Sequence, residues 1–319
     1  MSHRAYPLLP GYWAALEASA YFTQTRASCL RIGDSDRTAF LQRQTTNDLS
    51  SLSPERSVLT VLVSPTAHIL DVLRVMQVGD ELIVLTLPGH GSDTARYLKK
   101  RIFFMDKVWL EDESQRFVQV DLECPQACNA LLGLGFSMIP DLDGIAMGEI
   151  GGEAGFATGQ RGLSGTSYRL LVPSAGWEAV EQKLAEARAE RISEESRHIL
   201  RVEAGLPAAG AELTEEFTPL EAGLDYAVSG NKGCYTGQEV LARQATYDKV
   251  TRHLVRLQVD APAQAGERLW AGGKPVGVIT SAAVSPRSGA LALGVVKRPY
   301  HEQGAELTAG EDRQRAVVI

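Results

Sequence analysis

The sequence predicts a mixed α+β protein that ends in a small β-barrel or sandwich. Three observations predict this class: short amphipathic helices with recognisable caps, an antiparallel group of strands in the first third of the chain, and a β-rich C-terminal region. With 319 residues, 44% of them hydrophobic, the chain is long enough to bury a large core divided into two or three domains.

The first third of the chain combines two short helices with three strands. Residues 37–44 predict a helix capped by Asp36, with Phe40 and Leu41 on its buried side. Apolar runs separated by turn residues predict an antiparallel meander of three strands, at 58–63, 69–76 and 82–87. A second helix is expected over residues 92–101.

The second strand of this meander carries a carboxylate among apolar residues. By period-two alternation, Asp71 lies on the same face as Ile69, Leu73 and Val75. A carboxylate buried in such a place needs a partner or a ligand. The alternative is an edge strand with Asp71 at its solvated rim.

The central region predicts one strand and two further helices. Residues 168–172 read as a strand, and Ser174 is expected to cap a helix whose packed face carries Trp177, Val180 and Leu184. Glycines crowd residues 144–165, which predicts turns and short strands or a mobile lid.

A helix capped by Ser193 is expected to end near Gly205, with three residues turned inward: Ile199, Leu200 and Val202. Glu203 lies in its last turn. Because a negative charge near the negative end of a helix dipole is unfavourable, Glu203 is either solvated or held by a donor. The local pattern alone favours solvation.

The character of the chain changes after Thr251. Short β-rich runs are separated by glycine and proline at intervals typical of a small barrel or sandwich, at 254–259, 276–280, 291–296 and 316–319. We therefore place a domain boundary near residue 248.

Composition excludes several classes of protein. A net charge of −7 and a pI near 5.5 argue against a broad nucleic-acid-binding surface. No signal peptide or apolar run long enough to cross a membrane is apparent, so secretion and membrane insertion are not expected. Four scattered cysteines do not make a disulfide scaffold, and a reducing cytoplasm is the simplest location. The pair Cys124 and Cys128 matches no usual zinc spacing, so both are expected to be core thiols and no metal site is predicted.

The segment 232–239, Lys-Gly-Cys-Tyr-Thr-Gly-Gln-Glu, holds a cation, a thiol and a helix start within eight residues. Thr236 and Glu239 have capping-box spacing, so a helix is expected to start at Gly237. Its free amide N–H groups and the positive end of its dipole suit an anion and favour the thiolate form of Cys234. The alternative is an ordinary glycine-rich turn with a half-buried cysteine.

Three segments carry a resemblance to a known family. They are the octapeptide 232–239, Arg-Val-Glu-Ala-Gly at 201–205 and Phe-Thr-Pro-Leu-Glu-Ala-Gly at 217–223. Together they resemble the YgfZ family of folate-binding proteins, which is related to the aminomethyltransferase, or T-protein, of the glycine cleavage system. The residues 276–281 and Ser285-Pro286 are similar to the C-terminal barrel of T-proteins. The octapeptide is specific, whereas the other segments identify only the superfamily.

The resemblance covers most of the chain and implies its architecture. It implies a ring of three parts, with two interleaved α+β subdomains that bind folate over residues 1–248 and a C-terminal β-barrel over 249–319. Tetrahydrofolate or a derivative would bind in the central channel.

The resemblance also implies residues for the folate site. The T-protein glutamate that holds the pterin ring falls on Glu203, whose carboxylate would accept hydrogen bonds from pterin N–H groups. A basic T-protein residue near the ligand falls on Lys232, whose charge suits the glutamate tail of folate. The expected cofactor-binding residues also include Gly233, Tyr235, Gly237, Gln238 and Arg243. A surface role is the alternative for Arg243.

Two departures from the T-proteins bear on the activity. T-proteins carry two adjacent aspartates on a strand, one of which acts on the folate, but here Asp71 is followed by Val72. Asp71 would be catalytic in an aminomethyltransferase only if it is the required member of that pair. T-proteins also lack the octapeptide, which in the YgfZ family is associated with assembly or repair of iron–sulfur clusters in client enzymes.

Within the YgfZ family Cys234 is the expected catalytic residue. An exposed thiolate can act as a nucleophile, accept a sulfur or one-carbon fragment, or contact a cluster transiently. One thiol cannot hold a cluster alone, so stable cluster binding by this chain is not expected.

Three functions are therefore open. The leading hypothesis is a tetrahydrofolate-binding accessory factor for iron–sulfur enzymes, including those that modify transfer RNA, with folate and client enzymes or assembly proteins as partners and no stable nucleic-acid or membrane binding. The enzyme alternative is a folate-dependent aminomethyltransferase or demethylase. The third is an interaction protein whose pocket is a relic and which binds no folate.

Overall fold

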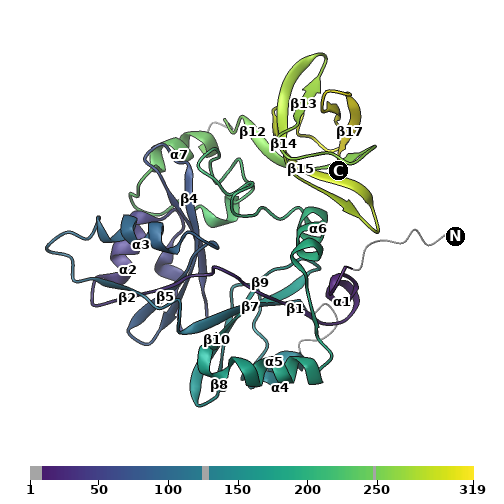
Figure 1. Ribbon diagram of the computed structural model, residues 1–319. Helices are drawn as coiled ribbons and strands as arrows, with labels where there is room; N and C mark the ends of the chain where they lie inside the picture. Colours follow the sequence, from purple (N-terminus) through teal and green to yellow (C-terminus); the bar gives the residue numbers. More distant parts are fainter. Residues whose placement is uncertain (1–8, 124–128, 247–248) are drawn as a thin grey trace.

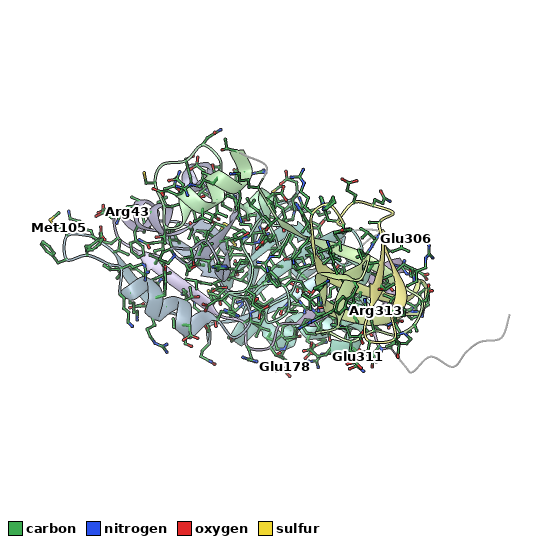
Figure 2. The ribbon with its side chains drawn as sticks, turned by 90° about the horizontal axis from the view of Figure 1, so that it is seen from above. Arg43, Met105, Glu178, Glu306, Glu311 and Arg313 are labelled. Atoms are coloured by element: carbon green, nitrogen blue, oxygen red, sulfur yellow. The ribbon has the colours of Figure 1, made fainter. Side chains whose placement is uncertain are left out.

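The computed structural model describes residues 9–123, 129–246 and 249–319. Its elements form three lobes, two built on open sheets and one a closed barrel, arranged around a common centre (Figure 1). In the view of Figure 2, Arg43 and Met105 lie at one end of the molecule and Glu306 and Arg313 of the barrel lie at the other. The predicted cysteine pair Cys124 and Cys128 lies outside the described residues.

The first lobe contains a five-stranded antiparallel sheet in the order β3-β4-β5-β2-β6. Its strands are β2 (Cys29–Gly33), β3 (Val58–Val63), β4 (Ile69–Val78), β5 (Glu81–Leu85) and β6 (Trp109–Asp112). The predicted meander of β3, β4 and β5 is confirmed, because long apolar runs joined by short turns pair with their neighbours in sequence.

Two helices, α2 (Arg37–Gln44) and α3 (Gly91–Lys99), pack on this sheet. Helix α2 has the predicted bounds, and its Phe40 and Leu41 are fully buried. Asp36 is the N-cap residue as predicted, but its carboxylate accepts from the amide of Lys107 instead of an amide of its own helix.

The second lobe contains a six-stranded sheet in the order β11-β1-β7-β10-β9-β8. Its strands are β1 (Ala20–Thr23), β7 (Phe117–Glu123), β8 (Ile145–Ile150), β9 (Glu153–Arg161), β10 (Thr166–Pro173) and β11 (Glu190–Arg191). Strand β1 pairs with β7 although all five strands of the first lobe lie between them in sequence, so the two lobes are interleaved along the chain.

The glycine-rich residues 144–165 form strands joined by a turn, as one of the two expectations had it, and not a lid. Strands β8 and β9 make a hairpin that turns at Gly151 and Gly152, both with positive φ. Within β9, a Cβ at Gly159 would lie 2.0 Å from the carbonyl oxygen of Asp141. These glycines therefore serve a tight turn and a close backbone approach rather than an irregular loop.

Four helices accompany the second lobe: α1 (Tyr12–Glu17), α4 (Asn129–Leu134), α5 (Trp177–Glu186) and α6 (Glu194–Ala204). Ser174 opens a short 3-10 turn, and Gly176 is the N-cap of α5, so the predicted cap is displaced. For α6 the prediction is confirmed: the Ser193 side chain accepts from the Ser196 amide, and Gly205 ends the helix in the left-handed region.

The third lobe is a closed six-stranded barrel in the order β12-β15-β14-β13-β16-β17. Its strands are β12 (Arg252–Val259), β13 (Arg268–Ala271), β14 (Lys274–Ser285), β15 (Gly289–Lys297), β16 (Glu306–Ala309) and β17 (Gln314–Val318). Four were predicted, whereas β13 and β16 were missed because four residues are too few to show an alternating pattern. Over the described ranges, no helix is long and apolar enough to cross a membrane.

Candidate functional site: a central cavity and an outer thiol loop

A cavity of about 520 Å³ is lined by residues of the two open sheets, of α6 and of the segment 206–226. Its wall draws on β3, β4, β5, β7, β9 and β10, so no single stretch of sequence defines it. Six arginines and three carboxylates line it: Arg26, Arg74, Arg161, Arg169, Arg197, Arg201, Asp121, Glu123 and Asp143. The surplus of cations suits a ligand with net negative charge.

Asp121 is the most heavily paired carboxylate of the cavity. Arg169 grips it with two hydrogen bonds of 2.7 and 3.0 Å, and Arg197 lies 3.8 Å away. The side-chain amides of Gln24 and Gln160 also donate to it. Burial alone would raise the pKa of Asp121, but Arg169 and Arg197 hold it below its usual value. Asp121 therefore stays ionised and its acceptor sites are taken by the protein.

Glu123, two residues further along β7, is only 2% exposed but has a much sparser set of partners. One oxygen accepts from the Ser167 hydroxyl at 2.9 Å and the other from the Leu163 amide at 3.1 Å. Burial, with the charge of Asp121 adding to it, raises the pKa of Glu123 to about 7. A carboxyl that titrates near neutrality therefore lines the cavity.

The exposed cations of the cavity are Arg26 and Arg161. The Arg161 guanidinium stacks over the Tyr226 ring at 4.0 Å, and neither arginine has an ion-pair partner among the described residues. Two other lining arginines form ion pairs: Arg74 with Asp143 at 2.8 Å and Arg201 with Glu212 at 3.2 Å. The cavity thus has buried carboxylates inside and free positive charge at its exposed parts.

The structure gives Asp71 an internal position, so the alternative of a solvated edge position is wrong. The carboxylate is fully buried and accepts from the Val72 and Leu87 amides and from the Thr94 hydroxyl, at 2.8, 2.9 and 2.5 Å. Burial raises the pKa of Asp71 to about 6, against these hydrogen bonds and the charge of His90. Asp71 is not part of the cavity wall, whereas Val72 is. The carboxylate therefore ties β4 to the ends of β5 and α3.

Glu203 is buried, so its expected solvation is wrong, and it is not among the residues that line the cavity. It is 7% exposed, and its side chain accepts from Tyr12 of α1 and from Ser285 and Arg287 of the barrel. The Arg287 contact is a 2.6 Å ion pair. The donor that its helix position requires is supplied by the protein, and Glu203 joins α1, α6 and the barrel.

Lys232 is buried, and its ammonium group is hydrogen-bonded to the protein backbone. Its ammonium donates to the carbonyl oxygens of Gln42, Thr45 and Asn47 at 2.7, 2.6 and 2.8 Å. These carbonyls lie at the C-terminal end of α2 and just beyond it, where a positive charge is favoured by the helix dipole. Burial lowers the pKa of Lys232 to about 8, although Asp48 opposes the shift. All three donors are used, so this conformation leaves none for the tail of a folate.

The rest of the octapeptide packs on the turn between β3 and β4. Gly237 has φ +79°, and a Cβ there would fall 2.8 Å from the Ser64 carbonyl oxygen. The Tyr235 ring is buried against Ala67 and Leu241. The glycine is therefore required by both its backbone conformation and its close contact.

Helix α7 (Gln238–Thr246) begins one residue after the predicted start, and Thr236 and Glu239 form no capping hydrogen bonds among the described residues. Gln238 bonds instead to the Lys232 carbonyl at 3.4 Å. Arg243 is exposed on this helix, and Gly233 is exposed in the loop. None of the octapeptide residues, nor Arg243, is part of the cavity wall.

Cys234 is an exposed free thiol, while Cys29 is buried and burial raises the pKa of that second thiol to about 12. The accessible thiol and the cavity are thus separate features of the first lobe and the molecular centre. Figure 1 shows α7 at the outer end of the first lobe, beside β4.

Sequence reasoning missed the cavity carboxylates Asp121 and Glu123. Their signal was present, because two acidic residues at positions i and i+2 of an apolar strand share one face.

Comparison with known proteins defines the class first. Residues 252–318 match the glycine cleavage T-protein C-terminal barrel domain. The fold aligns with the crystal structure of the glycine cleavage system aminomethyltransferase T from Bartonella henselae, with a TM-score of 0.85 over 97% of this chain and 87% of that chain at 22% identity. The architecture is therefore the T-protein fold.

Comparison with relatives of similar sequence identifies the family. It is 32% identical over 274 residues to an aminomethyltransferase of Thermus thermophilus, covering 84% of this chain and 75% of the relative. It is 31% identical over 290 residues to a chloroplastic protein of Arabidopsis thaliana named as a transferase, covering 89% of this chain and 66% of that longer relative. The chain belongs to the aminomethyltransferase, or glycine cleavage T-protein, family.

Proposed function

We propose that this protein is a tetrahydrofolate-binding accessory factor that supports the assembly or repair of iron–sulfur enzymes, including enzymes that modify transfer RNA, with Cys234 as its working thiol. The observation that carries the proposal is the separation of two features within a T-protein fold. A cation-rich cavity suits folate, and an exposed thiol lies outside that cavity, where a client protein can reach it.

The charge of the cavity supports folate as the ligand. Folate carries carboxylates on its glutamate tail and hydrogen-bond donors on its pterin ring. The free guanidinium groups of Arg26 and Arg161 suit the first, and the buried carboxyl of Glu123 suits the second. A cavity of this volume is also in the range used for ligands of such size.

Folate binding is tested by calorimetric titration with tetrahydrofolate. We expect saturable binding, weakened about tenfold in Arg26→Ala, the scale of one lost charge-assisted contact. Arg188→Ala is the matched control, because Arg188 is an exposed arginine outside the cavity wall. No binding by the wild type would overturn the folate proposal and favour an interaction protein with a relic pocket.

The position of the thiol favours action on a partner. Cys234 does not line the cavity, so transfer of a one-carbon fragment between folate and this thiol is not supported by the geometry. Contact with a client protein needs only an accessible thiol. Among the residues that the structure describes, no group of three or more potential ligands could hold a metal ion, so the cluster belongs to the client in this proposal.

The accessory role is tested in cells that lack the chromosomal copy of this chain. The measurement is the activity of an iron–sulfur enzyme after complementation with wild type, Cys234→Ala or Ala245→Ser, an exposed control position on α7. We expect restored activity with wild type and the control and reduced activity with Cys234→Ala. Equal activity in all three strains would remove the thiol from the proposal.

A second candidate function is aminomethyl transfer, which the named aminomethyltransferase relatives favour. Against it, β4 presents Val72 to the cavity where a carboxylate would be needed near the folate nitrogens. Folate-dependent release of formaldehyde, or transfer from a methylamine donor, tests it directly. Turnover by the purified protein would establish this function in place of the accessory role.

A further inference from the structure

The cavity holds one carboxylate whose hydrogen-bonding capacity is only half used. A carboxylate offers about four acceptor sites, two on each oxygen. Among the described residues, Glu123 receives one donor on each oxygen, from the Ser167 hydroxyl and the Leu163 amide. Asp121 instead receives two hydrogen bonds from Arg169 and further donors from Gln24 and Gln160.

The fold brings the backbone unusually close to this carboxylate. A Cβ at Gly162 would lie 2.8 Å from an oxygen of Glu123 and 2.2 Å from the Ser167 Cβ. Strands β7 and β10 also place Glu123 directly opposite Ser167 in register. The position of the carboxylate is therefore fixed from two sides, by a hydroxyl and by a chain segment that only glycine allows.

The charged groups around Glu123 do not neutralise it. On its own strand the nearest is Asp121, which carries a like charge. Arg197 of α6 faces the pair but lies 3.8 Å from Asp121, and Arg169 of β10 binds Asp121 as well. Within the described residues Glu123 has no ion-pair partner, which is unfavourable for a charge that is 2% exposed unless a ligand supplies donors.

We infer that Glu123 is the ring-binding group of the cavity: its two oxygens accept hydrogen bonds from a flat heterocycle that presents two neighbouring N–H donors, as the amino-pyrimidine edge of a reduced pterin does. The inference rests on the folate-binding function proposed above and names the residue that recognises the ring. Parallel N–H donors match the two oxygens of a carboxylate in the same way as a guanidinium does.

The inference has a pH signature that a structural role would lack. Donors from a ligand favour the ionised carboxylate, so binding below about pH 7 requires Glu123 to lose its proton. The affinity for a ring ligand should therefore rise as the pH rises from 6 to 8. A ligand that lacks the N–H edge should show no such dependence.

The experiment is a calorimetric titration at several pH values with two probes, tetrahydrofolate and p-aminobenzoylglutamate, which has the tail but no ring. For wild type we expect about a tenfold tighter Kd for tetrahydrofolate at pH 8 than at pH 6, from the fraction of Glu123 that is ionised. The Kd for the ring-free probe should change little over the same range.

The variant is Glu123→Gln, with Glu178→Gln as an exposed control. The glutamine oxygen can keep the Leu163 amide and its NH2 can donate to Ser167, so the local contacts are preserved. At pH 8 we expect about a tenfold loss of tetrahydrofolate affinity, a flat pH profile and unchanged binding of the ring-free probe.

The outcomes separate this inference from the function on which it rests. If wild type binds tetrahydrofolate and Glu123→Gln binds it with the same affinity and pH profile, the ring site is wrong and the folate proposal stands. If wild type binds no tetrahydrofolate, both are wrong. Should Glu123→Gln fail to fold, the two probes still decide the matter on wild type, because equal pH dependence for both would overturn the inference.

Discussion

The octapeptide loop and the central cavity differ in how their charged groups are satisfied. In the loop, the ammonium of Lys232 is saturated by three backbone carbonyls, and Tyr235 and Gly237 pack against the neighbouring turn. In the cavity, arginines outnumber carboxylates, and the part of the chain that the structure describes leaves acceptor sites on Glu123 unused. The charged group of the loop is thus fully hydrogen-bonded within the protein, and the loop exposes one thiol. The cavity instead keeps hydrogen-bonding groups that a ligand can use.

A distinctive sequence motif can either bind a ligand directly or shape the loop that presents a functional group. Three residues of the octapeptide, Lys232, Tyr235 and Gly237, fix the loop on α2 and on the β3–β4 turn. Only Cys234 and Gly233 are exposed without such a role among the non-charged positions of the segment. A motif can therefore be specific for a function because it shapes the loop that presents a single group.

The strongest test of the structural role of the loop is Lys232→Met. Removing the ammonium leaves three carbonyls at the end of α2 without their donor, so we expect the free energy of unfolding to fall by about 4 kcal/mol. Urea denaturation measures the change, and Lys183→Met, at an exposed lysine, is the control. A stable variant that has lost folate affinity would reverse our assignment and make Lys232 a ligand group.

The cavity should respond to pH in a way that the loop does not. The pKa of Glu123 is raised to about 7 in the folded protein, so between its ordinary value and pH 7 the folded state binds the additional proton. The resulting stabilisation is fully present below the unfolded pKa and is lost as the pH rises through 7, a change of up to ~3 kcal/mol.

Urea denaturation of the ligand-free protein at pH 4.5, 6 and 7.5 checks this prediction. Relative to Glu123→Gln, wild type should lose stability steadily across that range, because only wild type carries the titrating carboxyl. Parallel pH profiles for the two proteins would show that the carboxyl does not titrate in this window.

Gly237→Ala probes how tightly the loop is held on the β3–β4 turn. The left-handed backbone and the 2.8 Å approach to the Ser64 oxygen together should lower the free energy of unfolding by about 2 kcal/mol. Gly223→Ala is the matched control, since Gly223 has φ +73° but open space around it. If both variants lose the same amount, backbone strain alone explains the glycine and the close contact is unimportant.

The same contrast explains what could be predicted from the sequence. Helix α2, the cap of α6 and four barrel strands depend on local patterns, and the sequence-based bounds agree with the structure to within a few residues. The cavity depends on contacts between distant segments, such as Glu123 with Leu163 and Arg74 with Asp143. No local pattern could show that Val72, and not Asp71, is turned to the cavity.

The two charged residues that the resemblance assigns to the folate site have partners within the protein. Glu203 accepts from Tyr12 and Arg287, and Lys232 donates to backbone carbonyls such as that of Thr45. Charge and burial can be inferred from a sequence pattern, whereas the source of the compensating group depends on chain segments that lie up to 191 residues away.

The smallest expected effect is the change in stability caused by Cys234→Ser. This variant tests directly whether the octapeptide loop and the cavity have separate functions. The thiol is exposed and makes no core contact, so the free energy of unfolding should change by less than about 0.5 kcal/mol, and tetrahydrofolate affinity should stay the same because the residue is outside the cavity wall. Loss of client-enzyme activity in this variant, with stability and folate affinity intact, would assign the two regions separate tasks. A parallel loss of folate affinity would instead mean that the loop and the cavity act as one site.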